Sequence, residues 1–202
     1  AKAGSGFDGL DAFNSSDETQ SSNWRWQGAD AGRYDDDDVY AVRLLAQEGS
    51  SDRAYGPHAG QQFFNHVNER LRILGEIPLR KTGPDGRVLK DQTGKPDTSF
   101  LARIPADTPF TFQTLDRNGL VLNMAQTWHQ VRPGEVRADC GGCHAHSQKP
   151  VYLAQTAAGR PDYQPWDLTQ SRPLLSRDPA GQPALRQVQG GAADVEFHRD
   201  VR

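Results

Sequence analysis

The sequence predicts a mainly β fold, a small antiparallel sheet or sandwich with one or two helices and long irregular segments. Short runs rich in β-branched and aromatic residues recur through the middle of the chain, as is typical of strands. Turn-forming residues separate these runs at the intervals of an antiparallel sheet, at 84–86, 107–109, 118–119 and 133–134. The spacing of three and four that is typical of an amphipathic helix is clear only over residues 60–71.

We expect seven strands in the order in which these runs occur. The first follows an acidic run at 35–38, which we interpret as a solvated turn because it lacks the spaced carboxylates of a calcium-binding loop. The helix over 60–71 is expected to lie against the sheet. The predicted strands cover residues 39–45, 72–77, 87–89, 99–104, 110–115, 120–124 and 127–131.

Composition divides the chain into three parts. Residues 1–31 are rich in Gly, Ser, Asp and Asn with scattered aromatic residues, which favours an extended N-terminal arm. Residues 32–153 hold the predicted strands and helix, so they form the β-rich domain. Residues 154–202 carry many Gly and Gln and five prolines between positions 161 and 183. This last part is therefore expected to wrap the surface with little regular structure.

Charge and hydropathy exclude several classes of partner. The chain has 23 basic and 26 acidic residues, a net charge of -3, and the basic residues form no stripe. Nucleic acid is therefore not an expected partner. No apolar run approaches the roughly 20 residues that a membrane-spanning helix needs, so no membrane span is expected. Hydrophobic residues make up only 35% of the chain, which leaves little apolar material for a core.

One short motif carries most of the chemical information, Cys140-Gly141-Gly142-Cys143-His144. This is the C-x-x-C-H pattern of covalent c-type haem attachment. Two thiols at this spacing can reach the two vinyl groups on one edge of a porphyrin, and the next residue places an imidazole under the iron. The two glycines let the backbone pass close to the ring. We therefore expect one covalent haem c attached through Cys140 and Cys143, with His144 as an iron ligand and the porphyrin adding apolar core.

Three other interpretations of the cysteine pair are less favoured than haem. A redox-active disulfide needs a βαβ setting with the first cysteine at the start of a helix, whereas the strands predicted before Cys140 are antiparallel. A zinc site would have to be completed by His144 and His146 at an awkward separation, because the chain has no other cysteine. One local disulfide in a secreted protein is the third alternative. Haem attachment is favoured because both cysteines of the chain lie inside the motif.

The second axial position of the iron is expected to be filled by His or Met, as in most electron carriers of this type. His129 is the favoured ligand, because it lies just before the turn at 133–134 that returns the chain to the motif. Met124 and His129 should lie on opposite faces of a strand, so neither can simply replace the other. His66, on the predicted helix, is a more remote donor, and His146 would have to pass around the ring edge. An open site is the remaining alternative.

Several segments, in this order, resemble the haem-binding region of the hydrazine synthase alpha subunit. They are residues 73–78, residues 104–116, Trp128 and Arg132-Pro133-Gly134-Glu135, which lead into the motif. The resemblance covers residues 39–150 and implies an extracytoplasmic, multihaem redox protein with a β-rich haem domain. In that family a tyrosine four residues after the motif histidine holds the iron, and the histidine binds zinc. The present chain has Gln148 at this position, with His146 and Tyr152 nearby.

The last residues carry a second resemblance. Residues 195–202 are similar to the opening of the cytochrome domains of planctomycetes, where such a stretch precedes another C-x-x-C-H motif. This resemblance predicts that the native chain continues into a second haem domain, with residues 154–202 as the linker.

These observations predict a periplasmic or extracellular c-type cytochrome that transfers single electrons through one haem. Its expected partners are redox proteins, such as other cytochromes or haem domains. The alternative is a haem enzyme with an open iron site, acting on a small nitrogen compound or on peroxide. A third hypothesis is a structural β domain whose haem serves mainly to bind a larger assembly.

Overall fold

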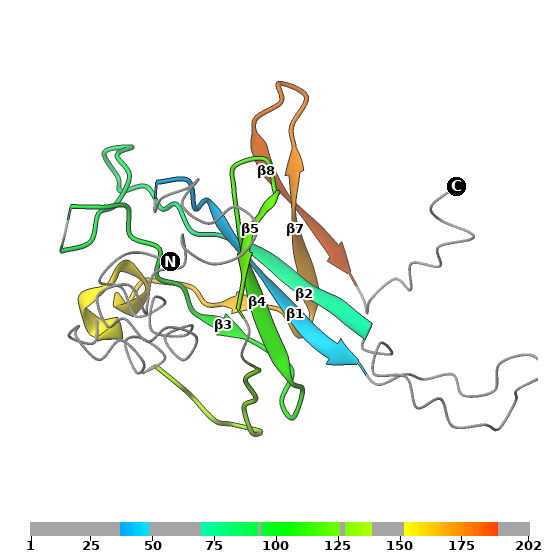
Figure 1. The fold of residues 1–202 in the computed structure, drawn as a ribbon. Coiled ribbons are helices and arrows are strands. Elements are labelled where there is room, and N and C mark those ends of the chain that lie inside the picture. The colour runs from blue at the N-terminus through cyan, green and yellow to red at the C-terminus, as the bar shows by residue number, and fades with distance from the viewer. Residues whose placement is uncertain (1–36, 49–69, 93, 126–127, 139–151, 190–202) are drawn as a thin grey trace, which may run out of the picture.

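The main feature of the protein is a four-stranded antiparallel sheet with the strand order β2-β1-β4-β5 (Figure 1). The computed structural model describes residues 37–48, 70–92, 94–125, 128–138 and 152–189. The four strands are β1 (Ala41–Glu48), β2 (Arg70–Pro78), β4 (Phe110–Leu115) and β5 (Val121–Met124). Strand β1 lies at the centre, because it pairs with β2 along one edge and with β4 along the other.

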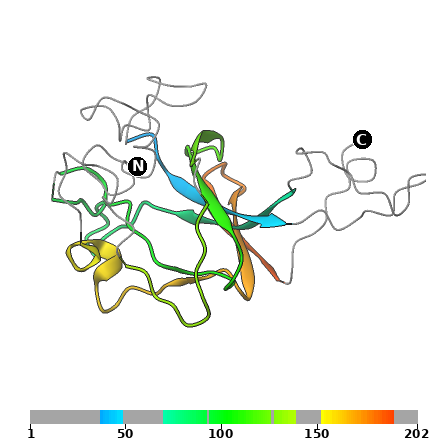
Figure 2. The ribbon, with the colours of Figure 1, turned by 60° about the horizontal axis from the view of Figure 1, so that its bottom comes forward.

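The remaining strands and turns lie around this sheet (Figures 1 and 2). Strand β3 (Ala102–Arg103) pairs in parallel with β6 (Trp166–Asp167), and β7 (Ser171–Arg177) forms an antiparallel hairpin with β8 (Pro183–Gln189). The described residues contain no α-helix, only the single 3-10 turns η4 (Leu153–Gln155) and η5 (Ala157–Gly159). In both views these turns lie on the same side of the molecule as the loops that follow β2.

One face of the sheet builds the hydrophobic core. Val42 of β1 lies opposite Ile77 of β2, and Leu44 lies opposite Phe112 of β4, so these side chains share a face. All of them are buried. They pack in one cluster with Leu168 and with the partly buried side chains Ala102, Ile104 and Trp166. The β3–β6 region therefore forms a second layer over this face.

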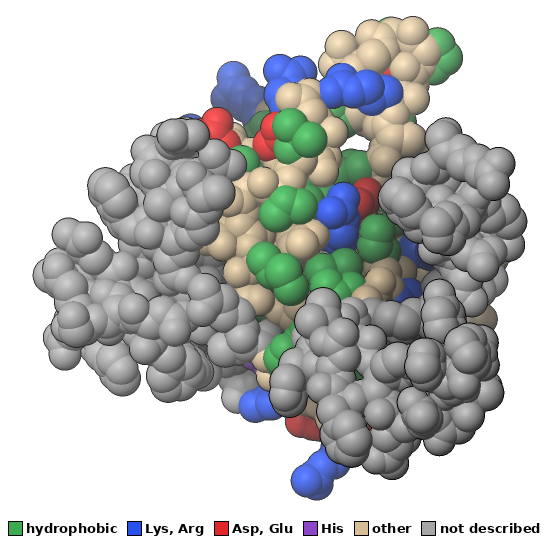
Figure 3. Space-filling model, turned by 45° about the vertical axis from the view of Figure 1, so that its right-hand side comes forward, with side chains coloured by type: hydrophobic (Ala, Val, Ile, Leu, Met, Phe, Trp, Pro, Cys, Tyr) green, Lys and Arg blue, Asp and Glu red, His purple; other side chains and the backbone are tan. Residues whose placement is uncertain are grey.

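The other face carries a row of polar side chains across three strands. Arg43 lies directly opposite both Glu76 and Gln113 in the sheet register. Its Nε donates to Glu76 Oε1 at 2.7 Å, and its Nη1 donates to Gln113 Oε1 at 3.0 Å. Glu76 Oε2 accepts the Leu175 N–H at 2.7 Å, so one carboxylate joins the sheet to strand β7. Figure 3 shows one face of the molecule, on which hydrophobic side chains gather with charged side chains among them.

A glycine in β2 permits a close approach of the C-terminal part of the chain. A Cβ atom on Gly75 would lie 2.7 Å from Leu168 Cδ2 and 3.0 Å from Pro173 Cδ. These distances are shorter than most real carbon contacts, so a side chain at this position would require Leu168 and Pro173 to shift. Gly75 permits the close approach of these residues without such a shift.

The coarse fold class is confirmed, since the described residues are mainly β, largely antiparallel and almost free of helix, whereas the covalent haem stays a prediction. Strand β4 has the predicted bounds, and β1, β2 and β5 lie within a few residues of theirs. The predicted strand 99–104 is reduced to the two residues of β3. The predicted strands 87–89 and 127–131 do not occur among the described residues. Each segment contributes only an isolated bridge, Val88 with Thr82 and His129 with Phe110.

The expectation of little regular structure after Leu153 was wrong. Strands β7 and β8 pair over seven residues each, although Pro173 and Pro183 lie within them. A two-stranded hairpin tolerates proline, because each strand uses only one of its two edges for pairing. Counting prolines as breakers therefore missed a regular hairpin.

The predicted helix over 60–71 was wrong at its end, because Arg70 and Leu71 belong to β2. The remaining residues of that helix lie outside the described part of the chain, as do the N-terminal arm 1–31 and residues 190–202. Arg70 and Leu71 pair with Glu48 and Gln47 of β1, and this ladder outweighs the local helical spacing. Among the described residues, no helix is long and apolar enough to cross a membrane.

Replacing Glu76 with alanine should destabilise the protein by about 3 kcal/mol, because it leaves the Arg43 guanidinium without its carboxylate in a largely buried site. The variant also removes the acceptor of the Leu175 N–H. Urea unfolding followed by far-UV circular dichroism measures the loss. The matched control is Arg87→Ala, which breaks an exposed ion pair of 3.8 Å and should cost less than about 0.5 kcal/mol. Equal losses of unfolding free energy in the two variants would contradict the stabilising role of the buried Glu76 contacts.

Candidate functional site

The residues of the predicted haem site fall into two groups. One group lies outside the described part of the chain. Residues 139–151, which hold Cys140, Cys143, His144 and His146, are not described, and neither is His66. Four other residues are described: Met124 at the end of β5, and Trp128, His129 and Tyr152 on the two segments that flank the motif. The described geometry of the site is therefore that of its two flanks.

His129 is fixed to the first residue of β4. Its N–H donates to the carbonyl oxygen of Phe110 at 2.8 Å, and the Phe110 N–H donates back to the His129 carbonyl at 2.8 Å. The two residues thus form a hydrogen-bonded antiparallel pair, and their side chains share a face of the sheet. The imidazole lies 5.7 Å from the Phe110 ring centre and 6.1 Å from that of Phe112, the latter nearly parallel at 24°. His129 is a half-buried imidazole in an aromatic setting.

Met124 lies on the opposite face of the sheet. It pairs with Gln113 in the β4–β5 register, and the Gln113 Nε2 donates a weak hydrogen bond to its Sδ at 3.7 Å. Gln113 is three residues from Phe110, the partner of His129, and side chains an odd number of residues apart on a strand point to opposite faces. The prediction that Met124 and His129 lie on opposite faces is confirmed.

The segment before the motif turns back at Pro133-Gly134, as predicted. The Glu135 N–H donates to the Arg132 carbonyl at 3.0 Å, and Gly134 has φ of 75°, which suits the third residue of a type II turn. Just before this turn, the Asp107 N–H donates to the Val131 carbonyl at 2.8 Å. This bond ties the chain to the loop that precedes β4 and marks the last backbone anchor before the motif in the described residues.

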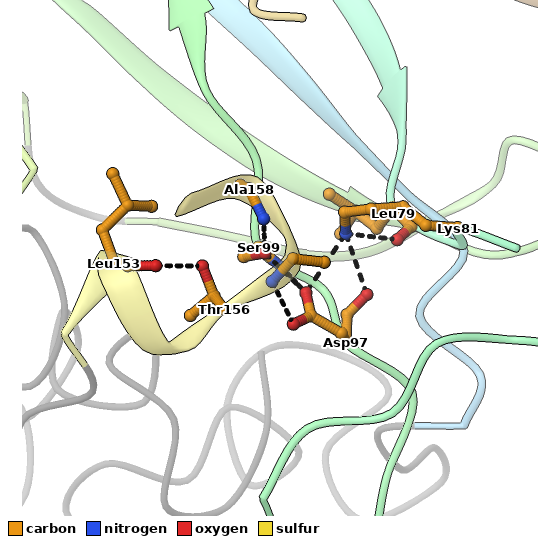
Figure 4. Close-up of polar contacts among 8 residues, drawn as sticks. Leu79, Lys81, Asp97, Ser99, Leu153, Thr156 and Ala158 are labelled. Atoms are coloured by element: carbon orange, nitrogen blue, oxygen red, sulfur yellow. Dashed lines mark hydrogen bonds and ion pairs between the residues drawn. The ribbon is translucent and has the colours of Figure 1, made fainter. Parts of the chain in front are cut away.

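The segment after the motif is anchored by a carboxylate, that of Asp97 (Figure 4). Asp97 Oδ2 accepts the Ala157 N–H at 2.8 Å, and Oδ1 accepts the N–H and the hydroxyl of Ser99 at 2.8 and 2.5 Å. The Ser99 Oγ in turn accepts the Ala158 N–H at 3.0 Å. Lys81 Nζ lies 3.2 Å from Asp97 Oδ1 and also donates to the carbonyl oxygens of Leu79 and Asp97. The two side chains of Asp97 and Ser99 thus bind the first two amides of η5.

The electrostatics of this cluster favour the ionised carboxylate. Burial by itself raises the pKa of Asp97, but the hydrogen bonds from Ser99 and Ala157 and the positive charge of Lys81 together outweigh it. The pKa of Asp97 therefore lies below its ordinary value of 3.8. At neutral pH the site holds a buried Asp97–Lys81 ion pair with its hydrogen bonds formed.

Asp97, Ser99 and Lys81 are functional candidates that the sequence alone did not reveal. The local signal is present, since an aspartate two residues before a serine is typical of a side-chain turn. Nothing in the sequence, however, relates Asp97 to Ala157, which lies 60 residues away. Within the described ranges, no group of three or more His, Cys, Asp or Glu side chains could hold a metal ion.

The stability of the wild-type protein should depend more steeply on acid pH than that of Asp97→Asn. Because the pKa of Asp97 is lower in the folded state, its contribution is complete above the ordinary carboxyl value and is lost as pH falls through the folded pKa. The variant should be less stable at pH 7, and the gap should shrink below about pH 4. Urea midpoints measured from about pH 7 to pH 2.5 test this. A gap that stays constant over this range would contradict it.

Comparison with known proteins agrees with the resemblance seen in the sequence. A family model described as the hydrazine synthase alpha subunit middle domain matches residues 38–145. The matched stretch includes β1 to β5 and the motif at 140–144, and it covers more than half of the 202 residues. No curated protein and no solved structure gives a significant match. The chain therefore belongs to the family of the hydrazine synthase alpha subunit middle domain.

Proposed function

We propose that this protein is a c-type cytochrome domain that carries one haem and transfers single electrons. The haem is attached through thioether bonds to Cys140 and Cys143, and His144 is an iron ligand. The observation that carries the proposal is the C-x-x-C-H motif at the end of the stretch that matches the family. When bound, the haem supplies an iron that can gain and lose one electron.

The described flanks of the motif suit a porphyrin. Three apolar or aromatic side chains on them are exposed: Trp128 at 40%, Val136 at 86% and Tyr152 at 67%. A porphyrin needs such side chains against its faces and edges, and their exposure in the protein alone is unfavourable. The motif supplies two thiols that can form thioether bonds and an imidazole that can bind the iron.

His129 is the proposed second axial ligand. It is an imidazole held near the start of the segment that leads to the motif, 11 residues before Cys140, so a short loop suffices to bring it to the iron. Its backbone is fixed by two hydrogen bonds to Phe110, which limits the cost of ordering it. Met124, His66, His146 and an open site are the alternatives, which optical spectra of the haem-loaded chain distinguish.

A haem enzyme with an open iron site is the second candidate, and the family match favours it. The matching family is named for hydrazine synthase, so an activity on a small nitrogen compound is the form that this candidate takes. Against it stands Gln148, at the position where the resemblance implies a tyrosine ligand. An amide is a poor ligand for haem iron, whereas imidazole and thioether are common ones.

Attachment of a haem by thioether bonds favours a location outside the cytoplasm, in the periplasm or beyond it. The partners are then other cytochromes or haem domains that exchange electrons with this one, and the C-terminal resemblance favours a second haem domain in the same native chain. These partners follow from the chemistry of the motif and from the low net charge, which does not favour nucleic acid.

Expression in a host that attaches haem c should yield a protein whose mass exceeds that of the polypeptide by one haem. The haem should stay bound after acid-acetone extraction, because thioether bonds survive denaturation. Cys140→Ser and Cys143→Ser should each lower the fraction attached, measured by mass spectrometry and by haem staining. A bare polypeptide mass for the wild-type chain would end the proposal.

Replacing His129 with alanine should convert the iron from low spin to high spin and open it to carbon monoxide, because the sixth position loses its imidazole. Optical spectra with and without carbon monoxide measure both changes. Met124→Leu is the matched control, since it removes the thioether at similar volume and should leave the spectrum unchanged. A wild-type protein that is high spin and binds carbon monoxide would favour the enzyme, and an unchanged spectrum in His129→Ala would exclude His129.

A further inference from the structure

We propose that Asn118 is a site of spontaneous deamidation, and that its contact with Arg177 slows the reaction in the folded protein. Both residues are described, and the site involves no haem, so it is separate from the proposed function. Deamidation would place a new carboxylate where the turn between β4 and β5 meets the turn between β7 and β8.

The reactive pair is Asn118-Gly119, in the turn between β4 and β5. An asparagine that precedes glycine deamidates most readily, because glycine has no side chain to hinder attack by its backbone nitrogen. The chain has six asparagines, and only Asn118 is followed by glycine. Asn118 is exposed, so water can reach it. Gly119 has φ of 82°, a conformation in which glycine is favoured at this position of the turn.

The reaction needs no partner molecule other than water. The Gly119 backbone nitrogen attacks Cγ of Asn118, so a bond forms between these two atoms and the bond from Cγ to Nδ2 breaks. Nδ2 leaves as ammonia, taking up the proton that the Gly119 N–H gives up. Water then opens the cyclic imide at one of its two carbonyl carbons, which yields aspartate or isoaspartate at position 118.

Three hydrogen bonds oppose this attack in the folded protein. The Gly119 N–H donates to the Asp116 carbonyl at 3.1 Å. Asn118 Nδ2 donates to Asp116 Oδ2 at 3.4 Å, and Arg177 Nη2 donates to Asn118 Oδ1. The carboxamide is thus held at both its oxygen and its nitrogen. Attack requires the Gly119 nitrogen to lose its proton and the carboxamide to turn toward it, so these bonds have to break first.

Arg177 is the partner that can be removed without changing the turn itself. It is the last residue of β7, 59 residues from Asn118, and its Nη1 donates to the Gly181 carbonyl at 2.7 Å. Asp116, by contrast, organises the turn, because its Oδ1 accepts the N–H of Asn118 at 2.7 Å and of Leu120 at 2.8 Å. Removing the Arg177 side chain therefore frees the carboxamide oxygen and leaves the hydrogen bonds within the turn in place.

The positive charge of Arg177 has an opposite effect that has to be compared with this restraint. A guanidinium at Oδ1 stabilises the negative charge that develops on this oxygen during attack. Arg177 and Asn118 are both exposed, however, so water stabilises the same charge when the guanidinium is absent. The loss of the restraint therefore outweighs the loss of the charge, and removal of Arg177 speeds the reaction.

The test follows deamidation of the full chain at mildly alkaline pH. Mass spectrometry of the peptide that contains Asn118 measures the fraction in which the amide has become an acid. Arg177→Ala should react about fivefold faster than the wild type, because one hydrogen bond of the carboxamide is lost. The matched control, Arg186→Ala, removes an exposed arginine of β8 and should stay within about a factor of two.

The same proteins unfolded in urea provide the second arm. There the contact between Asn118 and Arg177 is absent, so all three should react at one common rate, faster than the folded wild type. Asn123, which is buried in β5 and precedes Met124, is an internal reference that should stay unconverted in the folded chain. Far-UV circular dichroism identifies a variant that does not fold.

If Arg177→Ala does not fold, Arg177→Lys replaces it in the test. Lysine keeps the charge but has no planar fork to serve Asn118 and Gly181 together, so this variant should also react faster than the wild type. Equal or slower deamidation of the folded Arg177 variant overturns the proposal, and slower reaction would show that the guanidinium promotes the attack. A rate difference that persists in urea, or no conversion of Asn118 in the unfolded wild type, overturns it as well.

Discussion

The burial of strand β1 on both faces is the constraint on which the rest of the fold depends. Val42, Leu44 and Ala46 are buried on one side and Ala41 and Leu45 on the other. Pairing with β2 and β4 satisfies its backbone, but side chains on two faces need two separate coverings. The β3–β6 region supplies one, and the contacts of β7 with β2 place the C-terminal hairpin beside the sheet. Strands β6 and β7 follow the motif in the sequence, so the chain returns to the sheet after the motif.

Two buried carboxylates, Glu76 and Asp97, hold the chain where it returns to the sheet. Glu76 accepts the Leu175 N–H and so fixes β7, while Asp97 accepts the Ala157 N–H and so fixes η5. Each is a buried carboxylate on or near β2 with a basic partner, Arg43 or Lys81. A buried carboxylate costs free energy unless its charge and its lone pairs are all matched, so each site strongly favours one arrangement of the returning chain.

The strands of the main sheet could be predicted from the sequence because their signal is local. Strand β4 begins with alternating apolar and polar residues, Phe110 to Gln113, and lies between two turns, and its bounds were predicted correctly. The hairpin of β7 and β8 was missed because it contains prolines. A proline is compatible with a strand when its missing N–H falls on the unpaired edge, and the sequence does not show which edge is paired. Arg70 and Leu71 were assigned to a helix because their spacing fits one, whereas the ladder with β1 decides their structure. Asp97 carries a local turn signal, but its remote partner, Ala157, has no sequence signal at all.

The opposite orientation of Met124 and His129 bears on how the two candidate functions differ. A planar ring that approaches the sheet meets one face, so it can reach the imidazole or the thioether but not both. The imidazole lies 5.7 Å from the ring centre of Phe110 and 6.1 Å from that of Phe112, on the face that builds the core. The Met124 sulfur already accepts a hydrogen bond from Gln113, which belongs to the polar row of Arg43 and Glu76. Met124 is thus in contact with the polar row, whereas His129 belongs to the core face. Under the proposed function, exchanging one of these ligands for the other would therefore move the ring to the other face of the sheet.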